Sequence, residues 1–96
     1  GGKAADSIGR KIQAVAKGHQ AITITHLAPI AARADHHLVV TKHAIGKRTV
    51  SQIELQDLNG RAEEIARMID GAKITRATKL AAKKMLVRAT TESAAG

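Results

Sequence analysis

The side chains best placed for chemistry are Thr25 and His26, at the end of a short apolar segment. Residues 21–25 read Ala-Ile-Thr-Ile-Thr, and their β-branched side chains favour a buried strand. In open α/β sheets, ligands bind just outside the carboxyl ends of the strands. An imidazole there can donate to a phosphate oxygen or orient a water molecule. From these residues alone, His26 is either such a ligand contact or simply the cap of a turn.

Other patterns predict less chemistry. Gly46-Lys47 lacks the spacing of a phosphate-binding loop, because Thr41 stands where a glycine is needed and Arg48 where Ser or Thr is needed. This pair predicts an exposed hairpin turn instead. The chain has five histidines but no cysteine and no His-Glu-x-x-His pattern, so we predict no dedicated metal site. No serine or cysteine lies in a nucleophile elbow, so a hydrolase triad has little support.

The elements that must position His26 can be predicted from apolar periodicity and turn residues. The pattern predicts helices over residues 4–17, 29–34, 60–70 and 75–88, and strands over 21–25, 38–42 and 49–55. Gly9 within the first helix indicates a close backbone approach, and Gly18 is expected to end that helix with a positive φ. Asn59 is expected to cap the third helix. Residues 90–96 are predicted to be a frayed tail.

The same periodicity predicts which side chains face the core, and one place where the strand pattern slips. In the strand over 49–55 the alternation breaks at Ser51, which indicates either a bulge or an error in the predicted register. The side chains predicted to face inward on the first, third and fourth helices are Ala5, Ile8, Ile12 and Val15; Ala62, Ile65, Ala66 and Ile69; and Ala77, Leu80, Ala81 and Met85.

Composition limits how stable such a fold can be by itself. The chain has 96 residues and no Phe, Tyr or Trp, so its core must consist of small and aliphatic side chains. A chain of this length buries only about two-thirds of its unfolded surface. Without cysteine, neither disulfides nor a thiolate metal site can compensate. We therefore expect a piece that packs against something else.

The net charge of +8 is unevenly distributed along the chain. Residues 1–48 carry a balance of +6, residues 49–71 of −3 and residues 72–96 of +5. A basic balance suggests a polyanion such as a nucleic acid or a nucleotide, and the alternative is a solvated helix face. The absence of aromatic residues argues against single-strand binding by base stacking. The candidate nucleic-acid contacts lie on the last helix: Arg76, Lys79, Lys83, Lys84 and Arg88.

Three stretches together resemble one known family. They are Gly-Gly-Lys-Ala-Ala-Asp-Ser-Ile-Gly-Arg-Lys-Ile over residues 1–12, Ile-Thr-His-Leu-Ala-Pro-Ile-Ala-Ala over 24–32, and Arg-Ala-Glu-Glu-Ile-Ala-Arg-Met-Ile-Asp-Gly over 61–71. In this order they resemble the C-terminal part of bacterial RecN, an SMC-like ATPase of DNA double-strand break repair and recombination. The resemblance spans roughly residues 1–88. It implies an α/β fold, namely a C-terminal fragment of an ABC-type (P-loop NTPase) ATPase head with few strands and flanking helices, followed by a flexible tail over 89–96.

The resemblance also implies roles for particular residues. In that family two heads sandwich ATP. Gly1 and Gly2 resemble the tail of the D-loop, which contacts the opposite head, and Thr25 would lie beside the nucleotide. His26 resembles the switch histidine that contacts the γ-phosphate. ATP and Mg²⁺ are implied only for the complete head, because these residues include no Walker A, signature or Walker B motif.

The chain alone is therefore expected to bind no cofactor and to be inactive. The partners implied are the remainder of the head, a second head and DNA. The chain has no apolar run long enough for a membrane helix and no secretory signal, so we expect a cytoplasmic, nucleoid-associated protein without membrane contact. The alternative function is a non-enzymatic basic module that binds nucleic acid.

Overall fold

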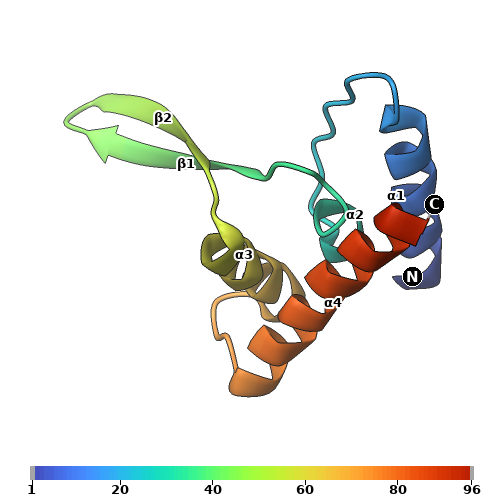
Figure 1. Ribbon diagram of the computed structural model, residues 1–96. Coiled ribbons are helices and arrows are strands. Elements are labelled where there is room, and N and C mark those ends of the chain that lie inside the picture. Colours follow the sequence, from blue (N-terminus) through green and yellow to red (C-terminus); the bar gives the residue numbers. More distant parts are fainter. Residues whose placement is uncertain (1, 96) are drawn as a thin grey trace.

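Helices form the body of the molecule, and one β-hairpin extends away from it (Figure 1). The computed structural model describes residues 2–95, with side chains from residue 2 to residue 92. The elements are α1 Gly2–Ala16, α2 Ala28–Ala31, β1 Leu38–Ile45, β2 Arg48–Leu55, α3 Leu58–Asp70 and α4 Arg76–Ala95. This mixture of helix and strand is compatible with the predicted α/β class. None of the helices in residues 2–95 is both long and apolar enough to cross a lipid bilayer.

The core lies where α2, α3 and α4 meet, and it consists mainly of alanine. Ile65 of α3 is the largest fully buried side chain, and Leu86 of α4 packs in the same cluster. Small side chains let the helices approach closely, which compensates in part for the absence of aromatic side chains. The remaining buried members of this cluster are Ala28, Ala32, Ala62, Ala66 and Ala82.

Helix α1 packs against α2 through its smallest residues. A Cβ atom on Gly9 would lie 3.0 Å from Cδ of Arg33 and 3.3 Å from the carbonyl oxygen of Pro29, which confirms the predicted close approach. Gly18 follows α1 with a φ of 81°, also as predicted. The predicted apolar face of α1 is wrong in part, because Ile8 and Val15 are 49% and 66% exposed. Ala5 is buried as predicted, and Gly9 is buried beside it, since the two backbones approach there.

Three details of α3 differ from the prediction. The helix begins earlier, and its cap is Asp57 rather than Asn59: the Asp57 carboxylate accepts a hydrogen bond from the Gly60 amide at 2.8 Å. Aspartate satisfies a free amide in this way as well as asparagine does. Ile69, predicted to be inward, is 44% exposed, while the other three predicted core residues of this helix are buried.

The buried face of α4 is one residue out of phase with the predicted one. Ala77, Leu80 and Ala81 are exposed and Met85 is only partly buried; the buried line is Thr78, Ala82, Leu86 and Ala89. Both faces of this helix carry apolar residues, so periodicity alone did not separate them.

The C-terminal end of α4 also differs from the prediction. The helix continues past the predicted end at Arg88 to Ala95, so residues 90–95 are helical rather than a frayed tail. Burial of Ala89 and the ion pair of Glu92 hold this last part against the body.

The hairpin is longer and more regular than predicted. β1 and β2 pair antiparallel from Leu38 opposite Leu55 to Ile45 opposite Arg48. Gly46, with a φ of 62°, forms the two-residue turn with Lys47. Ser51 pairs with Lys42 without a bulge, so the slip in alternation was an error in the predicted register.

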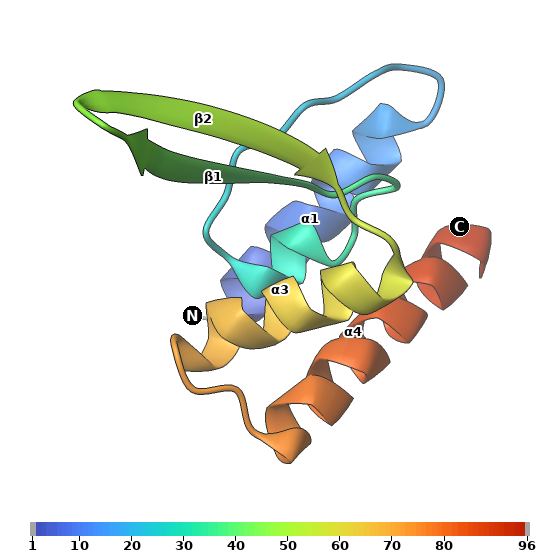
Figure 2. The same cartoon turned by 90° about the vertical axis from the view of Figure 1, so that its left-hand side faces the viewer.

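The predicted strand over residues 21–25 is absent. These residues are extended but lie in a long loop between α1 and α2, visible in Figure 2, and they have no strand partner among the described residues. Ile22 and Ile24 are 86% and 99% exposed, so the predicted burial is wrong for this chain by itself. A strand requires a neighbour for its backbone amides and carbonyls, and none is available here.

Candidate functional site

The segment that carries Thr25 and His26 forms a small polar bend directly before α2. The Thr25 hydroxyl accepts a hydrogen bond from the Leu27 amide at 3.0 Å, which fixes the bend around His26. The His26 side chain is exposed, and Pro29 lies in the first turn of α2. The bend thus presents an imidazole to solvent from a short segment that is anchored at its carboxyl side.

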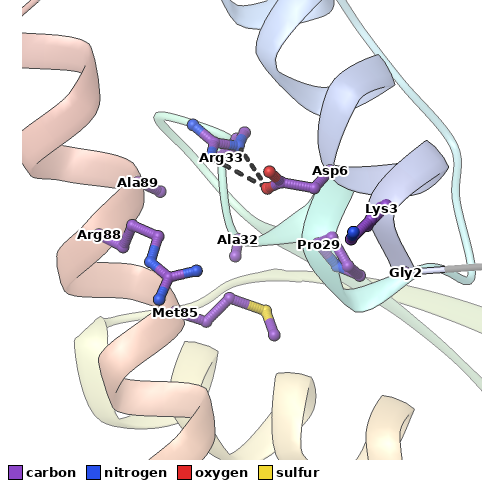
Figure 3. Close-up of a pocket in the computed structure, with 9 residues that line it drawn as sticks. All are labelled: Gly2, Lys3, Asp6, Pro29, Ala32, Arg33, Met85, Arg88 and Ala89. Atoms are coloured by element: carbon purple, nitrogen blue, oxygen red, sulfur yellow. Dashed lines mark hydrogen bonds and ion pairs between the residues drawn. The ribbon is translucent and has the colours of Figure 1, made fainter.

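The anchor is Arg33, whose side chain is only 4% exposed although it is charged. Its guanidinium donates to Asp6 of α1 at 3.0 Å and to Glu92 of α4 at 2.5 Å (Figure 3 shows the Asp6 contact). It also donates to the Gln13 side-chain oxygen at 3.1 Å. A buried charge requires such partners, because an unpaired one would be very costly. Arg33 therefore ties the end of α2 to both α1 and α4.

This charge cluster lowers the pKa of Asp6. The hydrogen bond from Arg33 lowers the pKa of Asp6, and the nearby charges of Arg33 and Arg10 act in the same direction, although burial opposes them. Arg10 also bridges Asp6 and Glu92, at 3.1 and 3.3 Å. Sequence reasoning missed the cluster because Arg33 and Glu92 are far from Asp6 in the chain; the one local signal is the four-residue spacing of Asp6 and Arg10.

A cavity of about 320 Å³ lies beside this cluster, where α1, α2 and α4 converge (Figure 3). Gly2 and Lys3 line it from α1, and Arg88 lines it from α4. The structure thus brings together two of the predicted site residues, Gly2 and Arg88, that come from opposite ends of the chain. Thr25 and His26 do not line this cavity. Gly1 lies outside the described residues.

The five basic residues predicted on the last helix do not form one patch. The spacing of Arg76, Lys79 and Lys83 places them along one side of α4, and that of Lys84 and Arg88 along another. Two exposed apolar side chains, Leu80 and Val87, lie between these sides. The Lys79 ammonium also lies 3.6 Å from the Glu63 carboxylate, which reduces the net positive charge on the side of α4 that carries Arg76, Lys79 and Lys83.

A further polar pair lies at the base of the hairpin. Arg61 of α3 donates to the carbonyl oxygens of Ala34 at 2.7 Å and Ala32 at 3.4 Å, and so closes the end of α2. The His37 carbonyl accepts from the Gln56 amide at 2.9 Å, which joins the two hairpin ends. His37 Nδ1 and Arg61 Nε are buried without a hydrogen-bond partner. Burial, and then the Arg61 charge, lower the pKa of His37. The His37 side chain is thus only partly exposed.

The histidines and acids do not assemble into a metal site. In the part of the chain that the structure describes, no three His, Asp or Glu side chains are close enough together to hold a metal ion. The carboxylates of Asp6 and Glu92 lie around the Arg33 guanidinium and neutralise its charge.

Comparison with curated proteins finds the resemblance that the sequence predicts. The chain is 39% identical to the DNA repair protein RecN of Halalkalibacterium halodurans over 89 residues, which is 93% of this chain. It is 42% identical to RecN of Xylella fastidiosa over 90% of the chain, and 45% identical to RecN of Deinococcus radiodurans over 74%. This chain is similar to a segment of RecN. The resemblance predicted from the three stretches above is therefore confirmed.

The match covers a small part of those proteins. The chain spans 16% of the Halalkalibacterium RecN, 15% of the Xylella RecN and 13% of the Deinococcus RecN. No family model matches the chain.

Proposed function

We propose that this chain is part of an SMC-like ATPase head of the RecN type that acts in DNA repair and recombination. In this proposal it contributes the switch histidine, His26, and the D-loop tail, Gly1 and Gly2, to an ATP site. The rest of that site comes from other parts of the protein. The observation that carries the proposal is the exposed His26, on a bend fixed by Thr25, within a chain similar to RecN.

The unpaired segment before His26 supports this assignment. Ile22 and Ile24 are almost fully exposed, yet their sequence is that of a buried strand. Burying two such side chains contributes about 1.5–3 kcal/mol each. A sheet formed by the remainder of the head would bury them and would place Thr25 and His26 at a strand end, where nucleotides bind.

The chemistry assigned to this chain is limited to its own groups. The His26 imidazole would donate to a γ-phosphate oxygen, where charge develops during transfer, and would help orient the attacking water. The Arg33 cluster would keep α2 in place, so that the bend has a fixed position. The complete head would bind ATP with Mg²⁺, which neutralises phosphate charge.

The test is the substitution His26→Ala in the full-length protein that carries this chain. We expect ATP turnover to fall about 10²-fold, which is typical for the loss of one such donor. ATP binding should weaken much less, because the cradle of the nucleotide lies elsewhere. His19→Ala is the matched control, since His19 is an exposed histidine of the same loop. Unchanged turnover in His26→Ala would refute the assignment.

The alternative, a non-enzymatic module that binds nucleic acid through α4, has weaker support. The basic residues of α4 lie on two sides of the helix. Exposed Leu80 and Val87 separate them, and Glu63 partly neutralises Lys79. We therefore retain α4 as a comparison for the experiment below rather than as the preferred DNA surface.

A further inference from the structure

The β-hairpin projects from the helical body with both of its faces open to solvent. Every residue of β2 is exposed, and along β1 only Val39 and Thr41 are partly covered. Figure 1 shows the hairpin extending away from the helices. An eight-residue strand is roughly 25 Å long, so the turn at Gly46 lies well clear of the body.

The hairpin is positively charged and contains no compensating acid along most of its length. No aspartate or glutamate occurs between Asp35 and Glu54. Within that stretch Lys42, Lys47 and Arg48 lie in the half of the hairpin near the turn. None of the ion pairs formed in the described part of the chain uses these three cations. Their charge is therefore available to an external anion.

The two halves of the hairpin differ in chemistry. In the half next to the body, Leu38 pairs with Leu55 and Val40 pairs with Ile53, so one face carries four exposed apolar side chains. That face suits packing against protein. In the half near the turn, the uncharged polar positions are hydroxyls and an amide, which donate readily to phosphate oxygens. These positions are Thr41, Thr49, Ser51 and Gln52.

We propose that the turn half of this hairpin, residues 41–52, binds duplex DNA, with Lys42, Lys47 and Arg48 contacting phosphates. A two-stranded ribbon fits the major groove of B-DNA, which is about 12 Å wide. The choice of DNA over another polyanion rests on the proposed role in DNA repair. The absence of aromatic side chains disfavours single strands, which are usually held by base stacking.

The experiment measures salt dependence of duplex binding by the full-length protein, without nucleotide, using a fluorescein-labelled duplex of about 30 base pairs and fluorescence anisotropy. The variant is Lys42→Gln/Lys47→Gln/Arg48→Gln. If all three cations contact phosphates, the slope of log affinity against log salt becomes shallower by about 2.7, at about 0.9 per phosphate. The matched control, Arg76→Gln/Lys83→Gln/Lys84→Gln on α4, removes the same charge and should change the slope much less.

Each outcome decides the proposal. A shallower slope in the hairpin variant only, with an unchanged thermal melting curve, supports it. An unchanged slope, or an equal change in the two variants, overturns it, because then only net charge matters. If the hairpin variant loses as much affinity for a single strand of the same length as for the duplex, the choice of duplex DNA is overturned. ATP turnover is not used in this assay, so failure of the His26 test leaves this result interpretable.

Discussion

At the scale of the residue, burial gives His37 and Arg33 roles that their types alone do not indicate. Arg33 has lost its water and is held by two carboxylates and an amide. His37 lies beside the Arg61 cation, with Glu64 close enough to oppose part of its effect. Both positions depend on helices that are distant in the sequence. Charge neutralisation within the fold therefore decides which polar residues are free to bind an external partner.

We predict that His37 makes folding pH-dependent. Its pKa in the folded chain is lowered below 6.5, so the unfolded chain binds that proton more readily. The stability contributed by neutral His37 is therefore present above about pH 6.5 and is lost as pH falls through the lowered pKa. Chemical denaturation of the chain at pH 7.5 and 5.5 should show lower stability at pH 5.5.

The variant His37→Gln should reduce that pH difference, whereas His36→Gln, which changes the exposed neighbour, should leave it intact. Proton NMR titration of the His37 ring gives an independent readout. A midpoint at or above 6.5 would show that burial and Arg61 do not act as described.

At the scale of the element, the close contact of α1 with α2 is the feature that positions the segment after His26. Gly9 makes this approach possible, and the Asp6–Arg33 ion pair holds it. The phase of α4 was predicted incorrectly, because alanines occur on several of its faces and only packing against α3 selects one. Where two faces of a helix are similarly apolar, packing against the neighbouring helix determines which face is buried.

We predict that Gly9→Ala destabilises the chain. Alanine favours a helix by about 1 kcal/mol over glycine, which alone would be stabilising. The added Cβ would, however, lie 3.0 Å from the buried Arg33 side chain and 3.4 Å from Cα of Ile30, so both neighbours must shift by a few tenths of an ångström in a closely packed place. We expect a net loss of about 1–2 kcal/mol by denaturant unfolding.

Gly2→Ala serves as the control, because nothing lies within 4 Å of a Cβ at that position. It should leave stability unchanged or slightly higher. If Gly9→Ala is as stable as Gly2→Ala, the contact between α1 and α2 is looser than the structure indicates.

At the scale of the whole molecule, the exposed apolar side chains outnumber those in the core. The segment 21–25 and the body half of the hairpin together expose Ile22, Ile24, Leu38, Val40, Ile53 and Leu55. Exposed apolar side chains in such numbers are typical of surfaces that pack against another part of a protein. The chain spans only 13–16% of the RecN proteins reported above, so most of such a protein lies outside these residues.

We predict that residues 21–25 become a protected strand in the full-length protein. Hydrogen–deuterium exchange should be fast at these amides in the isolated chain, where they have no strand partner. In the full-length protein the same amides should exchange much more slowly, while amides of α3 change little. Fast exchange at Ile22–Thr25 in both proteins would contradict the proposed completion of the sheet.

The sequence by itself determined the local features of this protein. Pro29, Gly18 and Gly71 set helix boundaries through their own backbone preferences, and the hairpin turn follows from Gly46. The order of three short stretches was enough to indicate RecN. His26 was singled out because it follows an apolar β-branched segment. All these features depend on neighbours in the chain, so they can be read without knowing the fold.

Only the tertiary structure decided which faces and charges are buried. The burial of Arg33, the orphaned nitrogen of His37 and the phase of α4 depend on contacts between distant helices. The segment 21–25 has the sequence of a strand but no partner, because a strand is completed by backbone hydrogen bonds to another strand. The projection of Lys42, Lys47 and Arg48 on an open ribbon was likewise invisible in the sequence, since charge counts carry no information about which cations are already paired.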